Sequence, residues 1–205
     1  MLLVAASAKP LRVLGIDPGT HVCGWGVVSR DGARLVAEGF GVVRARATAP
    51  IEERLRAIAA GLRDVVARLR PDEAAIEEVF YGRDVRAAVR IGEGRGAALV
   101  VVAEAGVPVT GYANNVVKRA VAGAGRAGKE SVHKMVRAVL GLASIEGPLD
   151  ASDALALAIC HHHQRAVAGA SAGGTPAGRL APRVEAAIAA AKAADLAKSR
   201  LRRRA

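Results

Sequence analysis

The sequence predicts an α/β domain built around a mixed five-stranded sheet that is flanked by helices. Three observations support this class. The first apolar segments have the length and turn signals of strands, the later segments alternate between helical and strand-like patterns, and 205 residues suffice for one domain with an appendage. Three strands in a meander, followed by helices that alternate with two further strands, indicate a mixed sheet.

The three leading strands are separated by turn signals. Residues 12–17 form a short apolar run, residues 24–29 form a second one, and Asp31-Gly32 is typical of a tight hairpin turn. We expect the third strand to continue to about Val43.

The next segment has helical periodicity. Pro50 opens it and Pro71 ends it, and its apolar residues recur every three or four positions, at Ile51, Leu55, Ile58, Leu62, Val65, Val66 and Leu69. Residues 73–80, with the sequence EAAIEEVF, then predict a short buried strand.

Helices dominate the rest of the pattern. We expect a helix over residues 84–105, a fifth strand over 107–110, a less certain segment over 115–122, and helices over 129–140 and 150–165. Residues 1–165 would form one domain and residues 166–205 an appendage. Ala, Gly, Ser, Thr and Pro dominate 166–178, which suggests a flexible linker, and 182–204 could be an Ala-rich basic helix that we expect to be disordered when nothing is bound.

Composition excludes several classes of protein. No apolar run reaches the roughly 18 residues that span a bilayer, the N-terminus is too weakly patterned for a secretory signal, and two cysteines make no disulfide framework, so we expect a cytoplasmic protein. Thirty Lys and Arg against nineteen Asp and Glu give a net charge of +11, with nine basic and two acidic residues from Gln164 onward. A nucleic acid is the partner this charge favours, and an Arg-rich solvated surface is the alternative.

Two acidic residues stand in apolar strands. Asp17 ends the first strand before Pro-Gly-Thr, where a charge is costly unless it is paired or bound to metal, although an Asp that only initiates a turn would look the same. Glu77 and Glu78 point to opposite faces of the 73–80 strand. The local pattern does not choose between them, and charges that protect an edge strand are the alternative for both.

Asp150 and Asp153 share one face at the start of the last helix. Capping of a helix N-terminus explains such a pair on its own. If these acids converge with Asp17 and a strand glutamate, however, the cluster needs cations, and all-oxygen ligands favour Mg²⁺ or Mn²⁺. Two such ions about 4 Å apart can clamp the attacking and leaving oxygens of a phosphodiester.

The ordered motifs resemble the RuvC family of bacterial Holliday junction resolvases over residues 11–165. The motifs are LGIDPGT and GWGVV within 14–28, AIEEVF at 75–80, GRGAALV at 94–100 and LDASDALALAICHHH at 149–163. The resemblance implies a ribonuclease H-like fold and a homodimer that nicks a four-way junction symmetrically with divalent metal, two Mg²⁺ per site. The catalytic and metal-binding acids would be Asp17, Glu77, Asp150 and Asp153.

The same resemblance implies contacts with DNA and partners. Phe80 would stack on a base near the junction centre with help from Tyr81, and the basic residues of the next loop and helix would follow the backbone: Arg83, Arg86 and Arg90. Lys118 and Lys129 would bind the scissile phosphate. A core role for Phe80 and an ordinary surface role for each lysine are the alternatives. The helix over 84–105 would form the dimer surface, and RuvA and RuvB would be partners.

Two further motifs look like ligand sites, a phosphate-binding loop and a zinc cluster, but a simpler interpretation is favoured for each. Gly123 to Lys129 matches a phosphate-binding P-loop except that Glu130 replaces the Ser or Thr that binds Mg²⁺, so a glycine-rich turn that carries a DNA-binding Lys129 is favoured. His161 to His163 suggest zinc, but three adjacent helical residues point in different directions, and we expect a helix end there.

Two other functions remain open. A sugar-kinase or actin-like ATPase also begins with a strand that ends in Asp-x-Gly-Thr, although 205 residues is short for its two lobes. A junction-binding architectural protein without activity is the second, and the presence of all four acids argues against it.

Overall fold

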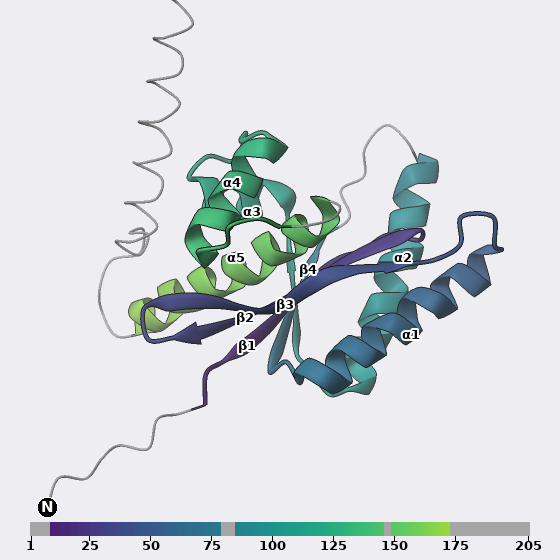
Figure 1. Cartoon of the computed structure of the whole chain (residues 1–205), viewed down its shortest axis with the longest axis horizontal. Coiled ribbons are helices and arrows are strands. Elements are labelled where there is room, and N and C mark those ends of the chain that lie inside the picture. The colour runs from purple at the N-terminus through teal and green to yellow at the C-terminus, as the bar shows by residue number, and fades with distance from the viewer. Residues whose placement is uncertain (1–8, 79–84, 146–148, 173–205) are drawn as a thin grey trace, which may run out of the picture.

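The protein is described by a computed structural model that covers residues 9–78, 85–145 and 149–172 (Figure 1). Its five strands form one sheet in the order β3-β2-β1-β4-β5. Strand β2 (Val22–Asp31) pairs antiparallel with both β1 (Arg12–Asp17) and β3 (Arg34–Arg44), whereas β4 (Glu73–Glu77) and β5 (Val109–Tyr112) run parallel to β1. The predicted mixed five-stranded sheet is therefore confirmed.

Helices cover both faces of the sheet (Figure 1). Helices α1 (Ile51–Leu69) and α2 (Val85–Glu104) pack on one face, and α3 (Asn114–Ala122), α4 (Lys129–Leu140) and α5 (Leu149–Ala172) pack on the other. No helix in the described part of the chain is long and apolar enough to cross a bilayer.

Alternation along β1 divides the core into two halves. Leu14 and Ile16 are fully buried among residues of α1 and α2, whereas Val13 is buried among residues of α5. Asp17 continues the series of Val13 and Gly15, so its side chain lies on the α5 face of the sheet.

Helix α5 lies unusually close to β1 and β2 because glycines face it. A Cβ atom added at Gly15 would collide with the carbonyl oxygen of Ala154, and one added at Gly24 would collide with the carbonyl oxygen of Asp150. The absence of side chains at these two strand positions sets the depth at which α5 rests on the sheet.

The boundaries of several elements differ from the prediction. Strand β4 ends at Glu77 rather than residue 80, β5 lies two residues later than expected, and the uncertain 115–122 segment is a helix that begins at Asn114. Helix α5 continues to Ala172, so residues 166–172 of the expected linker are helical. Residues 173–205 lie outside the described part of the chain.

The prediction of a helix end at the three histidines is wrong. His161, His162 and His163 are buried in the middle of α5. His162 donates from Nε2 to the carbonyl of Val28 at 2.9 Å, and His163 donates from Nδ1 to the carbonyl of Ala120 at 3.1 Å. The rings of His162 and His163 are therefore held by hydrogen bonds to backbone carbonyls in the core, and not by the dipole at a helix end.

Candidate active site

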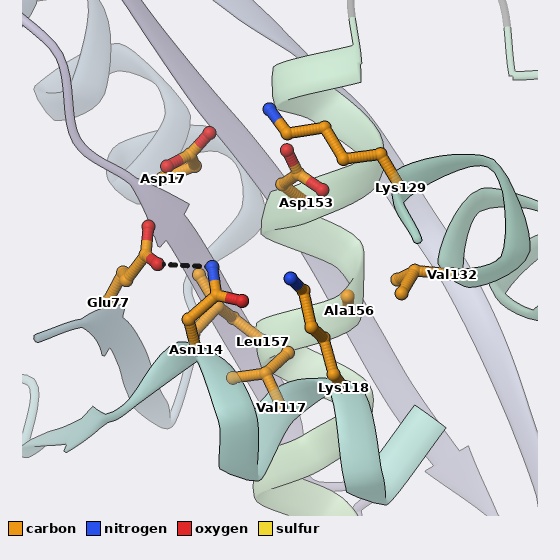
Figure 2. Close-up of a pocket in the computed structure, with 10 residues that line it drawn as sticks. All are labelled: Asp17, Glu77, Asn114, Val117, Lys118, Lys129, Val132, Asp153, Ala156 and Leu157. Atoms are coloured by element: carbon orange, nitrogen blue, oxygen red, sulfur yellow. Dashed lines mark hydrogen bonds between the residues drawn. The ribbon is translucent and has the colours of Figure 1, made fainter. Parts of the chain in front are cut away.

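A cavity of about 130 Å³ opens where the first strand, the fourth strand and three helices meet (Figure 2). Its lining combines acidic, basic and apolar side chains: Asp17, Glu77, Asn114, Val117, Lys118, Lys129, Val132, Asp153, Ala156 and Leu157. Five of the predicted site residues are thus brought together, each from a different element of the fold.

Parallel pairing of β1 with β4 brings Asp17 and Glu77 together. Ile16 is the register partner of Ile76, so the acid that follows each of them ends its strand at the same edge of the sheet. Both acids also lie on the α5 face of the sheet, whereas Glu78 is exposed beyond the end of β4. The choice that the local pattern left open therefore falls on Glu77 as the glutamate of the cavity.

The first turn of α5 supplies the other acids. Asp153 lines the cavity opposite Asp17 and Glu77 (Figure 2). Asp150 does not line the cavity, but its backbone rests on Gly24 of β2, and its charge is close enough to raise the pKa of Asp17. All four predicted acids thus gather around one region.

Burial and neighbouring negative charge make Asp17 and Asp153 hard to ionise. Burial is the largest cause that raises the pKa of Asp17 to about 8, and the charges of Glu77, Asp153 and Asp150 raise it further, in that order, while Lys129 lowers it. Burial also raises the pKa of Asp153, again against an opposing effect of Lys129. A pKa displaced by burial and neighbouring carboxylates is typical of functional sites.

These acids fit a divalent cation by their chemistry. Every acidic donor is a carboxylate oxygen, the ligand type that Mg²⁺ prefers, and a bound cation would offset the repulsion that raises the pKa of Asp17. Among the described residues, however, no three His, Cys, Asp or Glu side chains already converge tightly enough to hold an ion. The acids surround the cavity without meeting at a single point.

Two lysines bring positive charge to the cavity. Lys118 projects from α3, and Lys129 begins α4 directly after Gly128 (Figure 2). Lys129 is close enough to lower the pKa values of both Asp17 and Asp153. The site therefore combines acids that can bind cations with ammonium groups that can meet an anionic substrate.

Two residues of the site escaped prediction. Asn114 begins α3 and donates from Nδ2 to Oε1 of Glu77 at 2.7 Å, and Arg95 of α2 donates from Nε to the backbone carbonyl of Glu77 at 3.1 Å. A polar residue just after a strand was the available signal for Asn114, but the predicted end of that strand was two residues too early. Arg95 gave no local signal, because its partner is 18 positions away in the chain.

Of the remaining predicted DNA contacts, the structure describes the side chain of Arg90 alone, and it does not line the cavity. Arg90 is exposed on α2, and the others lie outside the described residues or have side chains that are not described: Phe80, Tyr81, Arg83 and Arg86. The P-loop alternative fails, since the segment before the glycines is helix α3 rather than a strand. The zinc alternative fails too, because each of the three histidine rings is hydrogen-bonded within the core.

Comparison with known proteins gives a consistent picture. Residues 13–161 match the model of the family described as crossover junction endodeoxyribonuclease RuvC. The protein of that name from Chloroflexus aggregans is 50% identical over 151 residues, which cover 74% of this chain and 92% of the relative.

Solved structures confirm the predicted ribonuclease H-like fold class. The structure described as T. thermophilus RuvC in complex with Holliday junction substrate superposes with a TM-score of 0.71 at 40% identity, over 76% of this chain and 94% of that one. The yeast mitochondrial Holliday junction resolvase Ydc2 shares the fold with a TM-score of 0.53 at 12% identity, over 73% and 77% of the two chains. A family match over residues 13–161 and a relative at 50% identity show that this chain belongs to the RuvC family of crossover junction endodeoxyribonucleases.

Proposed function

We propose that this protein resolves Holliday junctions by paired symmetrical nicks, and that its metal ligands and catalytic residues are Asp17, Glu77, Asp150 and Asp153. The observation that carries the assignment is the gathering of these acids, from β1, β4 and α5, around one cavity that also holds two lysines. Nucleases of this family depend on metal. We propose Mg²⁺ as the metal, with two ions per site and Mn²⁺ as a substitute.

The chain's own residues would prepare the phosphodiester for attack by water. Lys118 and Lys129 neutralise the scissile phosphate and hold it against the acids. Asn114 fixes one oxygen of Glu77 and leaves the other free for the cavity. Cations held by Asp17, Glu77, Asp150 and Asp153 would lower the pKa of an attacking water and stabilise the charge that develops on the leaving 3′ oxygen. The products would then carry 5′-phosphate and 3′-hydroxyl ends.

Positive charge elsewhere on the chain would hold the junction. The net charge of +11 favours phosphate contacts, and Arg83, Arg86 and Arg90 would follow the backbone beyond the cavity. Phe80 and Tyr81 would stack on bases at the junction centre. We further propose that residues 1–165 form the nuclease domain and that the basic segment 166–205 is an appendage.

A homodimer would match the two-fold symmetry of an opened junction. Helix α2 offers a surface for it: Val89 and Val100 are 55% and 53% exposed, and nothing lies within 4 Å of a Cβ added at Gly92 or Gly96 between them. These positions follow one another on one face of the helix. RuvA and RuvB are the proposed protein partners, and the cytoplasm, which holds the bacterial chromosome, is the proposed location.

The experiment compares Glu77→Gln with Glu78→Gln, two neutralised neighbours of which only the first lies in the cavity. Each protein is incubated with a synthetic four-way junction and with linear duplex, with and without Mg²⁺. We expect wild type and Glu78→Gln to cut the junction only with Mg²⁺ and to spare the duplex. Glu77→Gln should bind the junction normally and lose cleavage by at least about a hundredfold.

Each rival function has its own signature in this experiment. Junction binding by wild type without any cleavage in Mg²⁺ or Mn²⁺ would support the architectural protein. ATP hydrolysis without DNA would support the kinase-like enzyme. Normal cleavage by Glu77→Gln would refute the proposed ligand set.

A further inference from the structure

Three polar side chains connect α5 to β4 and β5 outside the cavity. The Tyr112 hydroxyl lies 2.9 Å from Nδ1 of His161, and Nε2 of His161 lies 2.6 Å from Oε2 of Glu73. The tyrosine and histidine rings meet edge to face, with centroids 5.7 Å apart. Arg165, one turn further along α5, pairs with the other oxygen of Glu73. The connection is mostly buried, with 6% of the His161 side chain and 18% of the Glu73 side chain exposed.

The two ends of this connection have settled protonation states. Burial, followed by the nearby Cys160 and Glu73, raises the pKa of Tyr112 to about 12, so its hydroxyl keeps its proton. Burial alone would raise the pKa of Glu73, but the hydrogen bond from His161 and the charge of Arg165 outweigh it and lower that pKa. Since an ionised Glu73 only accepts, Nε2 of His161 carries the hydrogen of that contact. When the ring carries this hydrogen alone, Nδ1 accepts the hydrogen of the Tyr112 hydroxyl.

The connection joins the elements that carry the acids of the cavity. Asp153, Leu157 and His161 follow one another on one face of α5, about one turn apart. On the strands, Tyr112 is the register partner of Glu77, and its carbonyl accepts the backbone N–H of Glu78 at 2.9 Å. A shift of α5 along the sheet would therefore change the separation of Asp153 from Glu77 and would also break the hydrogen bonds of His161.

We propose that Tyr112, His161 and Glu73 are positioning residues that hold Asp153 of α5 at a set separation from Glu77 of β4. This inference rests on the proposed function, because it assumes that these two acids act on one phosphodiester. None of the three residues lines the cavity. Their effect on cleavage passes through the placement of the acids, much as hydrogen bonds behind metal ligands orient those ligands.

The test removes one hydroxyl. Tyr112→Phe keeps the ring and breaks the hydrogen bond to His161, whereas the control Ser29→Ala breaks a hydrogen bond between β2 and β3, from the Ser29 hydroxyl to Glu38 at 2.6 Å. We expect Tyr112→Phe to lower kcat on the junction about tenfold and to raise the half-saturating Mg²⁺ concentration, with KM for the junction unchanged. Ser29→Ala should leave all three values at the wild-type level.

A readout without cleavage accompanies the kinetics. The imidazole ¹⁵N shifts of His161 should report the Nε2–H form in wild type, and Mn²⁺ binding in the absence of DNA should weaken in Tyr112→Phe but not in Ser29→Ala. Because α5 could repack locally, His161→Gln serves as a second variant and should reproduce both the lower kcat and the weaker Mn²⁺ binding.

The outcomes separate this inference from the proposed function. If wild type does not cut the junction, the proposed function fails. If wild type cuts and both variants match it in kcat and in Mn²⁺ binding, the positioning role is overturned while the nuclease assignment stands. An equal decline in Ser29→Ala and Tyr112→Phe would also overturn it, because the effect would then be general destabilisation.

Discussion

Asp17 is a site residue whose ionised side chain lowers the stability of the folded protein. Its carboxyl group ends a buried strand, and burial together with three neighbouring acids raises its pKa from 3.8 to about 8. At neutral pH the metal-free protein must therefore either ionise Asp17 against its surroundings or keep the carboxyl protonated. Conflicts of this kind between stability and activity are common in active sites.

Asp17→Asn should make the metal-free protein more stable. The pKa of Asp17 is higher in the folded protein than in the unfolded chain, so the folded state favours the protonated carboxyl group. This favourable contribution to folding is complete below about pH 3.8 and is lost as the pH rises towards 8. We expect the free energy of unfolding of the variant, relative to wild type, to be higher at pH 7.5 than at pH 4.5 by up to about 4 kcal/mol. Urea denaturation with a chelator present measures the difference.

The matched control for this comparison is Asp64→Asn, which neutralises an exposed acid on α1. It should change the free energy of unfolding by less than about 0.5 kcal/mol at either pH. A variant at Asp17 that is less stable than wild type, or a difference independent of pH, would contradict the environment described for this carboxyl group.

At the scale of elements, α5 sets the geometry of the site through backbone contact. Its first turn carries Asp150 and Asp153, and the same turn rests on Gly24 of β2. Helix α2 approaches from the opposite face, where Arg95 bonds to the carbonyl of Glu77. The acids are thus placed by two helices that contact strand backbone, a contact that has little capacity to adjust.

Gly24→Ala should separate α5 from the sheet. The added methyl group would overlap the Asp150 carbonyl, so we expect a loss of about 2–3 kcal/mol in the free energy of unfolding and a larger loss of cleavage than of junction binding. Gly39→Ala on β3 is the control, because its Cβ would make only an ordinary contact at 3.4 Å with Leu69. Equal stability and cleavage in the two variants would show that α5 tolerates displacement.

For the whole molecule, stability in acid depends on buried histidines of α5. Burial is the main cause that lowers the pKa of His162 from 6.5 to about 4, and it lowers the pKa of His163 in the same direction. These groups fold in their neutral form and take up protons on unfolding. Their contribution to stability is therefore present above about pH 6.5 and is lost as the pH falls towards 4, opposite in sign to that of Asp17.

The two effects can be separated in an Asp17→Asn background. There we expect the free energy of unfolding to fall by about 3 kcal/mol between pH 6.5 and pH 4, and His162→Gln to reduce this slope. His21→Gln, at an exposed position, should leave the slope unchanged. A slope that is the same with and without His162 would place the acid sensitivity elsewhere.

Sequence reasoning succeeded where the signal was local. Two prolines and the apolar periodicity between them predicted both ends of α1, and alternation along residues 73–80 placed Glu77 and Glu78 on opposite faces. It failed for His161, whose partners are 49 and 88 residues away in the chain, and for the choice between Glu77 and Glu78, which required either strand register or family resemblance. Phe80 and the segment 173–205 stay predictions.

Helix α5, which carries two of the four acids, is synthesised after the strands that carry the other two. Chains leave the ribosome N-terminus first and begin to fold as they emerge. β1 and β4 are completed long before Leu149–Ala172 appears, so until then the growing polypeptide lacks two of the four proposed acids and the helix that carries them. If the four acids act together as proposed, a nascent chain cannot assemble its active site before α5 has been synthesised.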